Sequence, residues 1–128
     1  MRLLLDSQIL IAIMHSDIGS LPPIEAALSS PDNQMVVSTV SLWELSIKYR
    51  LGKLTLLRPP ERMPSYFQSL GYLLLPVNHR HAVENLQDQP PTRDPFDRML
   101  LAQCQVEGLR LVTIDRALIG HPLAWRAP

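Results

Sequence analysis

Four of the acidic residues stand in apolar surroundings or at strand ends, where a carboxylate is uncommon unless it does chemistry. The first is Asp6, which follows the apolar run Leu3–Leu5 and precedes another that starts at Ile9. The end of a buried strand is where open α/β sheets bind their ligands. We therefore favour a functional role for Asp6 over a purely structural helix N-cap, which Ser7 could provide instead.

Glu44 interrupts an apolar helix face. If residues 40–51 are helical, this carboxylate shares one side of the helix with Val40, Ile47 and Leu51. Burial of an unpaired carboxylate costs several kcal/mol or raises its pKa until it is neutral. Glu44 therefore needs a cation, either a Lys or Arg side chain or a metal ion, unless it lies at the edge of the face and reaches solvent.

The other two acids follow turn signals. Asp94 with Pro95 behind it is typical of a helix N-cap, which puts Asp97 in the first turn, where the helix dipole favours an anion. For Asp97 a surface role and a ligand role are equally supported. Asp115 ends an apolar run beside the hydroxyl of Thr113, and taken alone it is best interpreted as the cap of the following turn.

Taken together, the four acids support a metal site. Three lie at strand-to-helix junctions, which meet at one edge of a parallel sheet, and Glu44 projects from a neighbouring helix. Four clustered carboxylates cannot all stay ionised without divalent cations between them. All-oxygen ligands favour Mg²⁺, with Mn²⁺ as a substitute, and Mg²⁺ commonly acts on phosphates. This indicates phosphodiester cleavage by metal-activated water.

The elements that must position these acids alternate between short apolar runs and helical patterns, which predicts an α/β fold. We expect a three-layer α/β/α sandwich with a parallel sheet of about five strands. The predicted strands are Leu3–Leu5, Met35–Val37, Leu73–Val77, Arg110–Ile114 and Leu123–Trp125. The predicted helices are Ser7–Met14, Pro22–Ser29, Val40–Leu51, Glu61–Leu70, His79–Leu86 and Asp94–Glu107, with one further helical turn at Arg116–Ile119.

Composition sets the outer limits. With 128 residues, 46% of them hydrophobic, and no linker or repeat, the chain is expected to form a single domain over residues 1–128. Twelve basic residues balance twelve acidic ones, so a strongly basic nucleic-acid footprint is absent. The single cysteine, Cys104, rules out an internal disulfide framework and is expected in the core. No stretch predicts a signal peptide or membrane span, so we expect a cytoplasmic protein.

Several segments follow one another in the order of a known family. They are Leu-Leu-Asp-Ser at 4–7, Val-Ser-Thr-Val-Ser-Leu-Trp-Glu-Leu-Ser-Ile-Lys at 37–48, Leu-Gly-Lys-Leu at 51–54, Arg-Asp-Pro-Phe-Asp-Arg-Met-Leu-Leu-Ala-Gln at 93–103, Leu-Val-Thr-Ile-Asp at 111–115 and Leu-Ala-Trp at 123–125. Together they resemble the PIN-domain family, and more narrowly the VapC-type toxins of bacterial type II toxin–antitoxin pairs. The most specific part is the Asp-Pro-Phe-Asp-Arg block with Thr-x-Asp eighteen residues after its second Asp.

The resemblance implies a Mg²⁺-dependent endoribonuclease whose acidic quartet corresponds to Asp6, Glu44, Asp97 and Asp115. Asp6 and Asp97 would be the principal metal ligands, with the other two completing the cluster directly or through water. It also implies a cognate VapB-type antitoxin, an RNA substrate and a homodimer.

Accessory residues follow from the same resemblance. Ser7 and Thr113 match positions that line the site and would orient a carboxylate or a water. Independently of the resemblance, Asp94 precedes Asp97 as the helix cap, and Arg98 and Arg116 each follow a site acid by one residue, where they could pair with a carboxylate or reach a phosphate. Thr92 is a departure, because this subgroup often has a histidine there.

Other patterns are weaker. We interpret His79 and His81 as a strand-to-helix corner and not as a metal pair. A basic stretch, formed by Lys48, Arg50, Lys53, Arg58 and Arg62, is more typical of a solvated face than of an RNA-binding rim. Trp43 and Trp125 are expected to pack in the protein and not to stack on bases.

Rival functions are less well supported. A phosphoryl-accepting receiver domain would need adjacent acids after the first strand and a lysine after the last, and this chain has no lysine beyond Lys53. A dehalogenase-type phosphatase would need Asp-x-Asp where the chain has Asp6-Ser7-Gln8. The main alternative is a catalytically silent PIN-like binding module that acts through protein or RNA partners.

Overall fold

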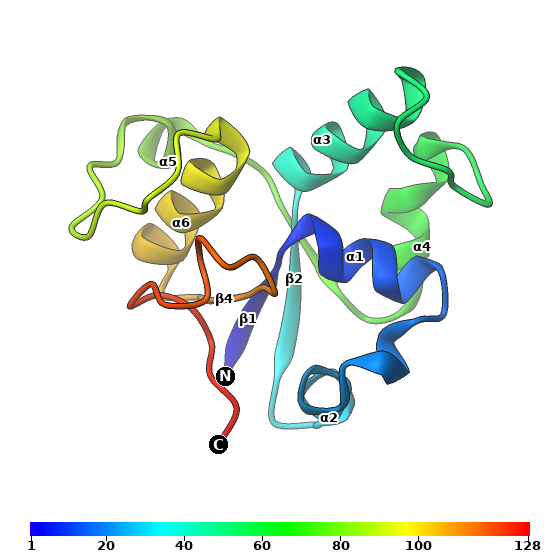
Figure 1. Ribbon diagram of the computed structural model, residues 1–128, viewed down its shortest axis with the longest axis horizontal. Coiled ribbons are helices and arrows are strands. Elements are labelled where there is room, and N and C mark those ends of the chain that lie inside the picture. The colour runs from blue at the N-terminus through cyan, green and yellow to red at the C-terminus, as the bar shows by residue number, and fades with distance from the viewer.

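Short apolar runs form one parallel sheet in the computed structural model, which describes residues 1–128 (Figure 1). The strands are β1 (Arg2–Leu5), β2 (Gln34–Ser38), β3 (Leu73–Leu75) and β4 (Arg110–Val112), in the order β3-β2-β1-β4. At the centre of the sheet, Leu4 of β1 pairs with Val36 of β2 and with Leu111 of β4. The predicted α/β/α class is confirmed, with four strands in the sheet.

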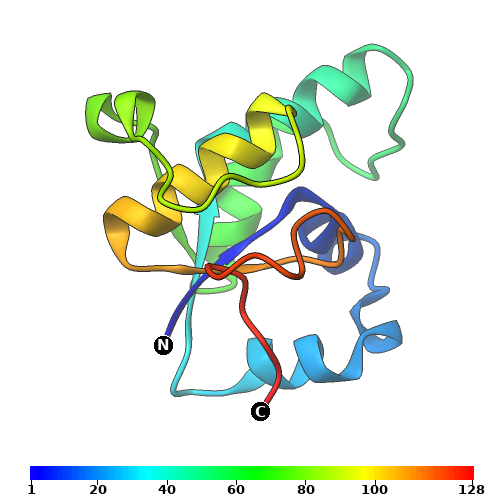
Figure 2. The same cartoon turned by 60° about the vertical axis from the view of Figure 1, so that its left-hand side comes forward.

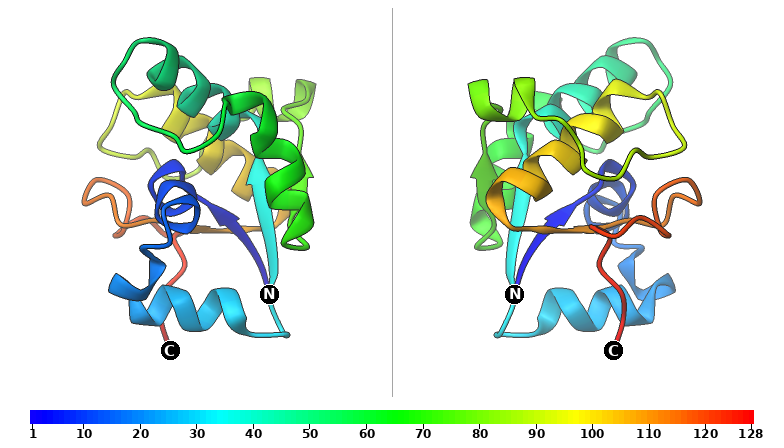
Figure 3. Two further views of the ribbon diagram at one scale, coloured as in Figure 1. Left: turned by 90° about the vertical axis from the view of Figure 1, so that its right-hand side faces the viewer. Right: turned by 90° about the vertical axis from the view of Figure 1, so that its left-hand side faces the viewer.

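Helices cover both faces of the sheet. They are α1 (Ser7–Met14), α2 (Pro22–Ser29), α3 (Thr39–Arg50), α4 (Met63–Ser69), α5 (His79–Val83) and α6 (Pro95–Glu107), with 3₁₀ turns at Ile18–Ser20 and Pro60–Arg62. Figure 1 shows α5 and α6 on one side of β1 and β2, and α1 and α4 on the other. The side views show α2 at the opposite end of the molecule from α3 (Figure 3). None of the helices has the length and apolar character that crossing a membrane requires.

The inner parts of β1, β2 and β4 are apolar because both faces of the sheet are buried there, whereas Arg2, Gln34 and Arg110 begin these strands. Alternate side chains point to opposite faces, so Leu3 and Leu5 belong to one core cluster and Leu4 to the other. The first cluster includes Phe67 from α4, and the second includes Leu100 from α6. The carboxyl ends of the strands therefore lie between the two layers of helices.

One predicted element near the carboxyl terminus is wrong. The segment Leu123–Trp125 does not form a strand but makes a single parallel bridge, between Ala124 and Leu111. Pairing is limited to this residue because Pro122 lacks an N–H and a turn precedes Ala124, whose N–H donates to the carbonyl of His121. The single helical turn predicted at residues 116–119 is present as one turn, closed by the N–H of Ile119 on the carbonyl of Asp115 at 2.9 Å, and it does not continue into a helix.

His81 is structural, as predicted for this corner. Its ring is buried, and Nδ1 accepts a hydrogen bond from the backbone N–H of Asn78 at 3.1 Å. A neutral ring therefore carries its proton on Nε2, which lies 3.1 Å from Oε2 of Glu107. The Asn78 side chain accepts from the backbone N–H groups of Arg80 and His81, which completes a capping box at the start of α5. This network ties α5 to the end of α6, away from the first turn of α6.

Candidate acidic active site

The four predicted acids come from four different segments and gather at the carboxyl edge of the sheet. Asp6 follows β1, Glu44 lies on α3, Asp97 is in the first turn of α6, and Asp115 lies in the loop after β4. Figure 2 shows the starts of α1, α3 and α6 around this edge. Burial is the largest cause of the raised pKa of Asp97, and the charges of Asp94 and then of the other three acids add to it.

Asp6 is the most deeply buried of the four, with 3% of its surface exposed. It is the N-cap residue of α1, and its Oδ1 accepts the backbone N–H of Ser7 at 2.7 Å. Burial raises the pKa of Asp6, the hydrogen bonds from Thr113 and Ser7 oppose that rise, and the charges of Glu44 and Asp115 add to it. The Asp6 carboxylate therefore both caps α1 and lies in the acidic site. Ser7 holds Asp6 through its backbone.

Thr113 links two of the acids. Its hydroxyl donates to Oδ2 of Asp6 at 2.7 Å. The hydroxyl oxygen of Thr113 also accepts a hydrogen bond from the backbone N–H of Asp115 at 3.0 Å. Asp115 in turn accepts the backbone N–H of Ala117 at 2.8 Å, which confirms its interpretation as the cap of the following turn. Thr113 therefore fixes the relative positions of the chain ends after β1 and β4.

Replacing Thr113 by valine should lower the free energy of unfolding by about 1–3 kcal/mol, because the buried Asp6 loses a donor and the Asp115 N–H loses its acceptor. Urea denaturation of the metal-free protein measures this change. The matched control is Thr113→Ser, which keeps the hydroxyl and should recover most of the loss. Equal stability of the valine variant and wild type would show that the Thr113 hydroxyl does not support Asp6.

Glu44 has a cation as its partner. Its side chain is buried on α3, and Lys48, one turn later, donates to Oε2 at 2.7 Å. This hydrogen bond is the largest cause of the raised pKa of Lys48. Lys48 is therefore not part of a purely solvated basic stretch, and its i, i+4 spacing from Glu44 is the sequence signal for such a pair. The predicted apolar face is only partly correct, since Val40 is buried but Leu51 is 63% exposed beyond the end of α3.

Asp97 is the acid whose carboxylate has the fewest protein hydrogen bonds. Asp94 caps α6 as predicted, and its Oδ1 accepts the N–H groups of Phe96 at 2.8 Å and of Asp97 at 3.3 Å. The carboxylate of Asp97 itself is half-buried and accepts no hydrogen bond from a protein donor. Burial first, and then the charges of Asp94 and the other acids, raise the pKa of Asp97 to about 7.

Arg98 does not pair with a carboxylate. Its guanidinium donates to the carbonyl of Thr92 at 3.3 Å and to the side chain of Gln89, so it holds the 87–93 loop against α6. Thr92 supports the same junction, because its hydroxyl oxygen accepts the N–H of Asp94 at 3.1 Å. The residues on either side of Asp94 thus position the start of α6.

The donor chemistry at this edge fits a hard divalent cation. All four acids offer oxygen, and burial first, with the charges of neighbouring acids adding to it, raises the pKa of Asp6 and of Asp97. No three acid, histidine or cysteine side chains lie close enough together to hold one ion. In their present positions at most two of these carboxylates could therefore contact the same ion.

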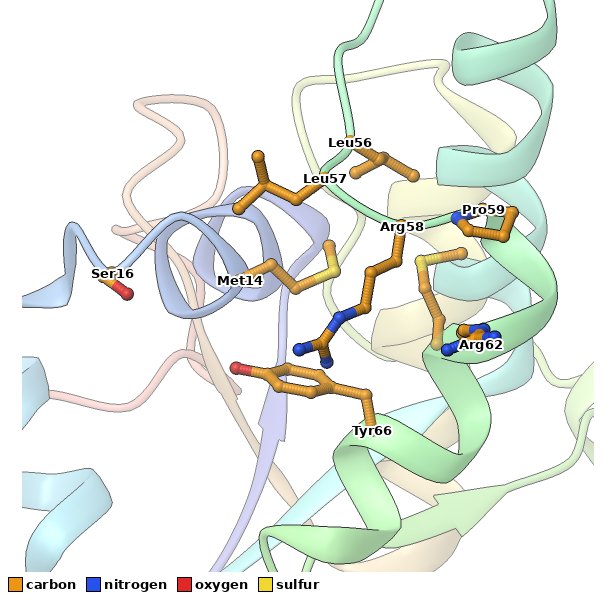
Figure 4. A pocket seen from close by; sticks show the side chains of 9 residues that line it. Met14, Ser16, Leu56, Leu57, Arg58, Pro59, Arg62 and Tyr66 are labelled. Carbon is orange, nitrogen blue, oxygen red and sulfur yellow. The ribbon is translucent and has the colours of Figure 1, made fainter.

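A separate pocket of about 250 Å³ lies between the end of α1, the 56–59 segment and α4 (Figure 4). The guanidinium of Arg58 lies over the ring of Tyr66, 5.8 Å from its centroid, and Arg62 lines the same pocket. No carboxylate lines it, so it takes no part in the acidic cluster. Four residues of the basic stretch thus have separate surroundings. Lys48 pairs with Glu44, Arg50 pairs with Glu61, and Arg58 and Arg62 line this pocket.

The fold and the site place this chain in a class of α/β proteins that have acidic oxygen donors at the carboxyl edge of a parallel sheet. The sequence model of the PIN domain matches residues 3–120, and the chain belongs to the PIN domain family. The PIN domain is generally a nuclease fold, and PIN domains are commonly metal-dependent nucleases. No curated protein matches the chain.

Proposed function

We propose that this PIN domain is a VapC-type toxin of a type II toxin–antitoxin pair that hydrolyses RNA phosphodiester bonds with Mg²⁺. The observation that carries the proposal is the convergence of Asp6, Glu44, Asp97 and Asp115 from four segments. These acids are close enough that, after burial, their charges add to the rise in the pKa of Asp97. Such a cluster is stabilised by a divalent cation, and phosphates are common substrates of bound Mg²⁺.

Each acid has a distinct part in this proposal. Asp97, which accepts no protein hydrogen bond, and Asp6, which Thr113 and Ser7 orient, would be the principal ligands. Glu44 and Asp115 would complete the site directly or through water. A bound divalent cation supplies a Lewis acid for the phosphate and lowers the pKa of water. Lys48 holds the Glu44 carboxylate in place and offsets part of the negative charge that would repel RNA.

The partners follow from the resemblance to VapC-type toxins. We propose a VapB-type antitoxin as the restraining partner, a homodimer as the assembly and the cytoplasm as the place of action, where cellular RNA is accessible. Residues 1–128 would act as one domain.

Digestion of total RNA by the purified, antitoxin-free protein tests the activity. We expect discrete cuts with Mg²⁺ that disappear in EDTA and return when Mg²⁺ or Mn²⁺ is added in excess. Mapping the cut ends would identify the substrate. A well-folded protein that leaves total RNA intact with either metal would contradict the proposed activity.

The second candidate is a catalytically silent PIN-like module that binds a protein or RNA partner. The spacing of the acids favours it, since no three of them stand close enough to hold one ion. The structural uses of two acids favour it as well, because Asp6 caps α1 and Asp115 caps a turn. RNA that is bound but not cut in the digestion would support this candidate.

A further inference from the structure

Trp43 does not pack in the core, contrary to the expectation from sequence. It lies on α3 with 62% of its surface exposed, whereas Trp125 is half-buried against the first core cluster. Tryptophan presents a large ring with a polar N–H, and such residues are enriched where proteins bind partners.

The Trp43 ring is held by a second aromatic side chain. Phe96, at the start of α6, lies with its ring centroid 5.6 Å from that of Trp43 at an interplanar angle of 67°. This edge-to-face arrangement leaves at least one face of each ring uncovered by the other. Phe96 is half-buried against the second core cluster, so the pair is anchored to the fold on one side and open on the other.

The aromatic pair, Trp43 and Phe96, joins α3 and the start of α6, the two helices that carry Glu44 and Asp97. Each ring belongs to the residue just before a site acid, Glu44 in one case and Asp97 in the other. Consecutive residues on a helix project about 100° apart, so each ring faces a different direction from the neighbouring carboxylate while sharing its helical turn. On α3, Trp43 also borders a shallow depression of about 260 Å³ that extends toward Pro60.

We propose that the aromatic pair is a stacking platform for an unpaired base of the RNA next to the scissile phosphate. The inference rests on the proposed function, since it takes the RNA phosphate to lie at the acids. A base of the same strand then reaches the adjacent ring, where stacking tolerates any base because each has a π face. A base within an A-form duplex is not free to stack in this way, so the platform selects single-stranded or loop RNA.

The kinetic test uses Trp43→Ala, Trp43→Phe and the control Tyr49→Ala, which removes another exposed aromatic from α3. Rates are followed at the strongest cut in total RNA. Loss of one stacked base should raise KM about 10-fold in the alanine variant, with kcat within about threefold of wild type. Phenylalanine should restore most of the affinity, and the control should match wild type. An unchanged KM in Trp43→Ala would overturn the platform.

Fluorescence gives a readout that does not depend on cleavage. In EDTA, titration with oligoadenylate, whose bases are unpaired, should quench the tryptophan emission of wild type but not that of Trp43→Phe, which retains only Trp125. Annealing the oligoadenylate to its complement should abolish the quenching. Absence of quenching in wild type, or equal quenching in Trp43→Phe, would overturn the proposal.

The two proposals fail in different ways. Metal-dependent cutting that is equal in wild type and Trp43→Ala removes the platform and leaves the nuclease intact. A change of oligomeric mass in Trp43→Ala with unchanged KM assigns Trp43 to a protein interface and also removes the platform. Intact RNA with every variant overturns the nuclease itself.

Discussion

Replacing Asp97 by asparagine is expected to lower Mg²⁺-dependent RNA cleavage by about 100-fold or more. Loss of groups that only orient metal ligands already costs about 10- to 100-fold in activity or metal affinity, and a proposed direct ligand should cost at least as much. No protein donor binds the Asp97 carboxylate, so both of its oxygens are free to bind a metal ion. The measurement is the initial rate at a mapped cut in total RNA.

Asp17→Asn is the matched control, because it removes one negative charge from an exposed turn. This variant should cleave RNA at the wild-type rate. Circular dichroism and urea denaturation establish that the asparagine variant at position 97 is folded. Retained cleavage in that variant would remove Asp97 from the metal site.

The same substitution should stabilise the metal-free protein at high pH. The pKa of Asp97 is about 7 in the folded chain, against an ordinary value of 3.8. Between these values the folded state retains a proton that the unfolded state has released, so stability falls as pH rises through this range. Removing the ionisable group should raise the free energy of unfolding by about 1–3 kcal/mol at pH 8, a figure reduced for partial solvent screening.

Urea denaturation in EDTA at a series of pH values measures this effect. The gain in Asp97→Asn should be full above pH 7 and absent below about pH 4, where Asp97 is protonated in both states. Asp6 also has a raised pKa, so part of the wild-type slope remains in the variant. Excess Mg²⁺ should stabilise wild type more than the variant, because it binds the folded carboxylates. A stability difference that is independent of pH would mean that Asp97 is not under electrostatic strain.

Local signals in the sequence predict much of this protein. The bounds of α1 and α2 agree with their predicted ranges, and Asp94 caps α6 as its position before Pro95 indicates. Caps and periodicity are recognisable because they involve hydrogen bonds and packing faces within a few residues. The missed partnership of Lys48 with Glu44 is also local, and the i, i+4 spacing was sufficient to find it.

The sequence by itself determined which acids follow the ends of strands, and it determined that strands and helices alternate along the chain. Only the tertiary structure decided the strand order, the contact between Thr113 and Asp6 across 107 residues, and the pairing of Trp43 with Phe96 from separate helices. It also decided that residues 123–125 make one bridge and not a strand. The reason is physical: local hydrogen bonds set backbone conformation, whereas distances between remote side chains depend on how whole elements pack.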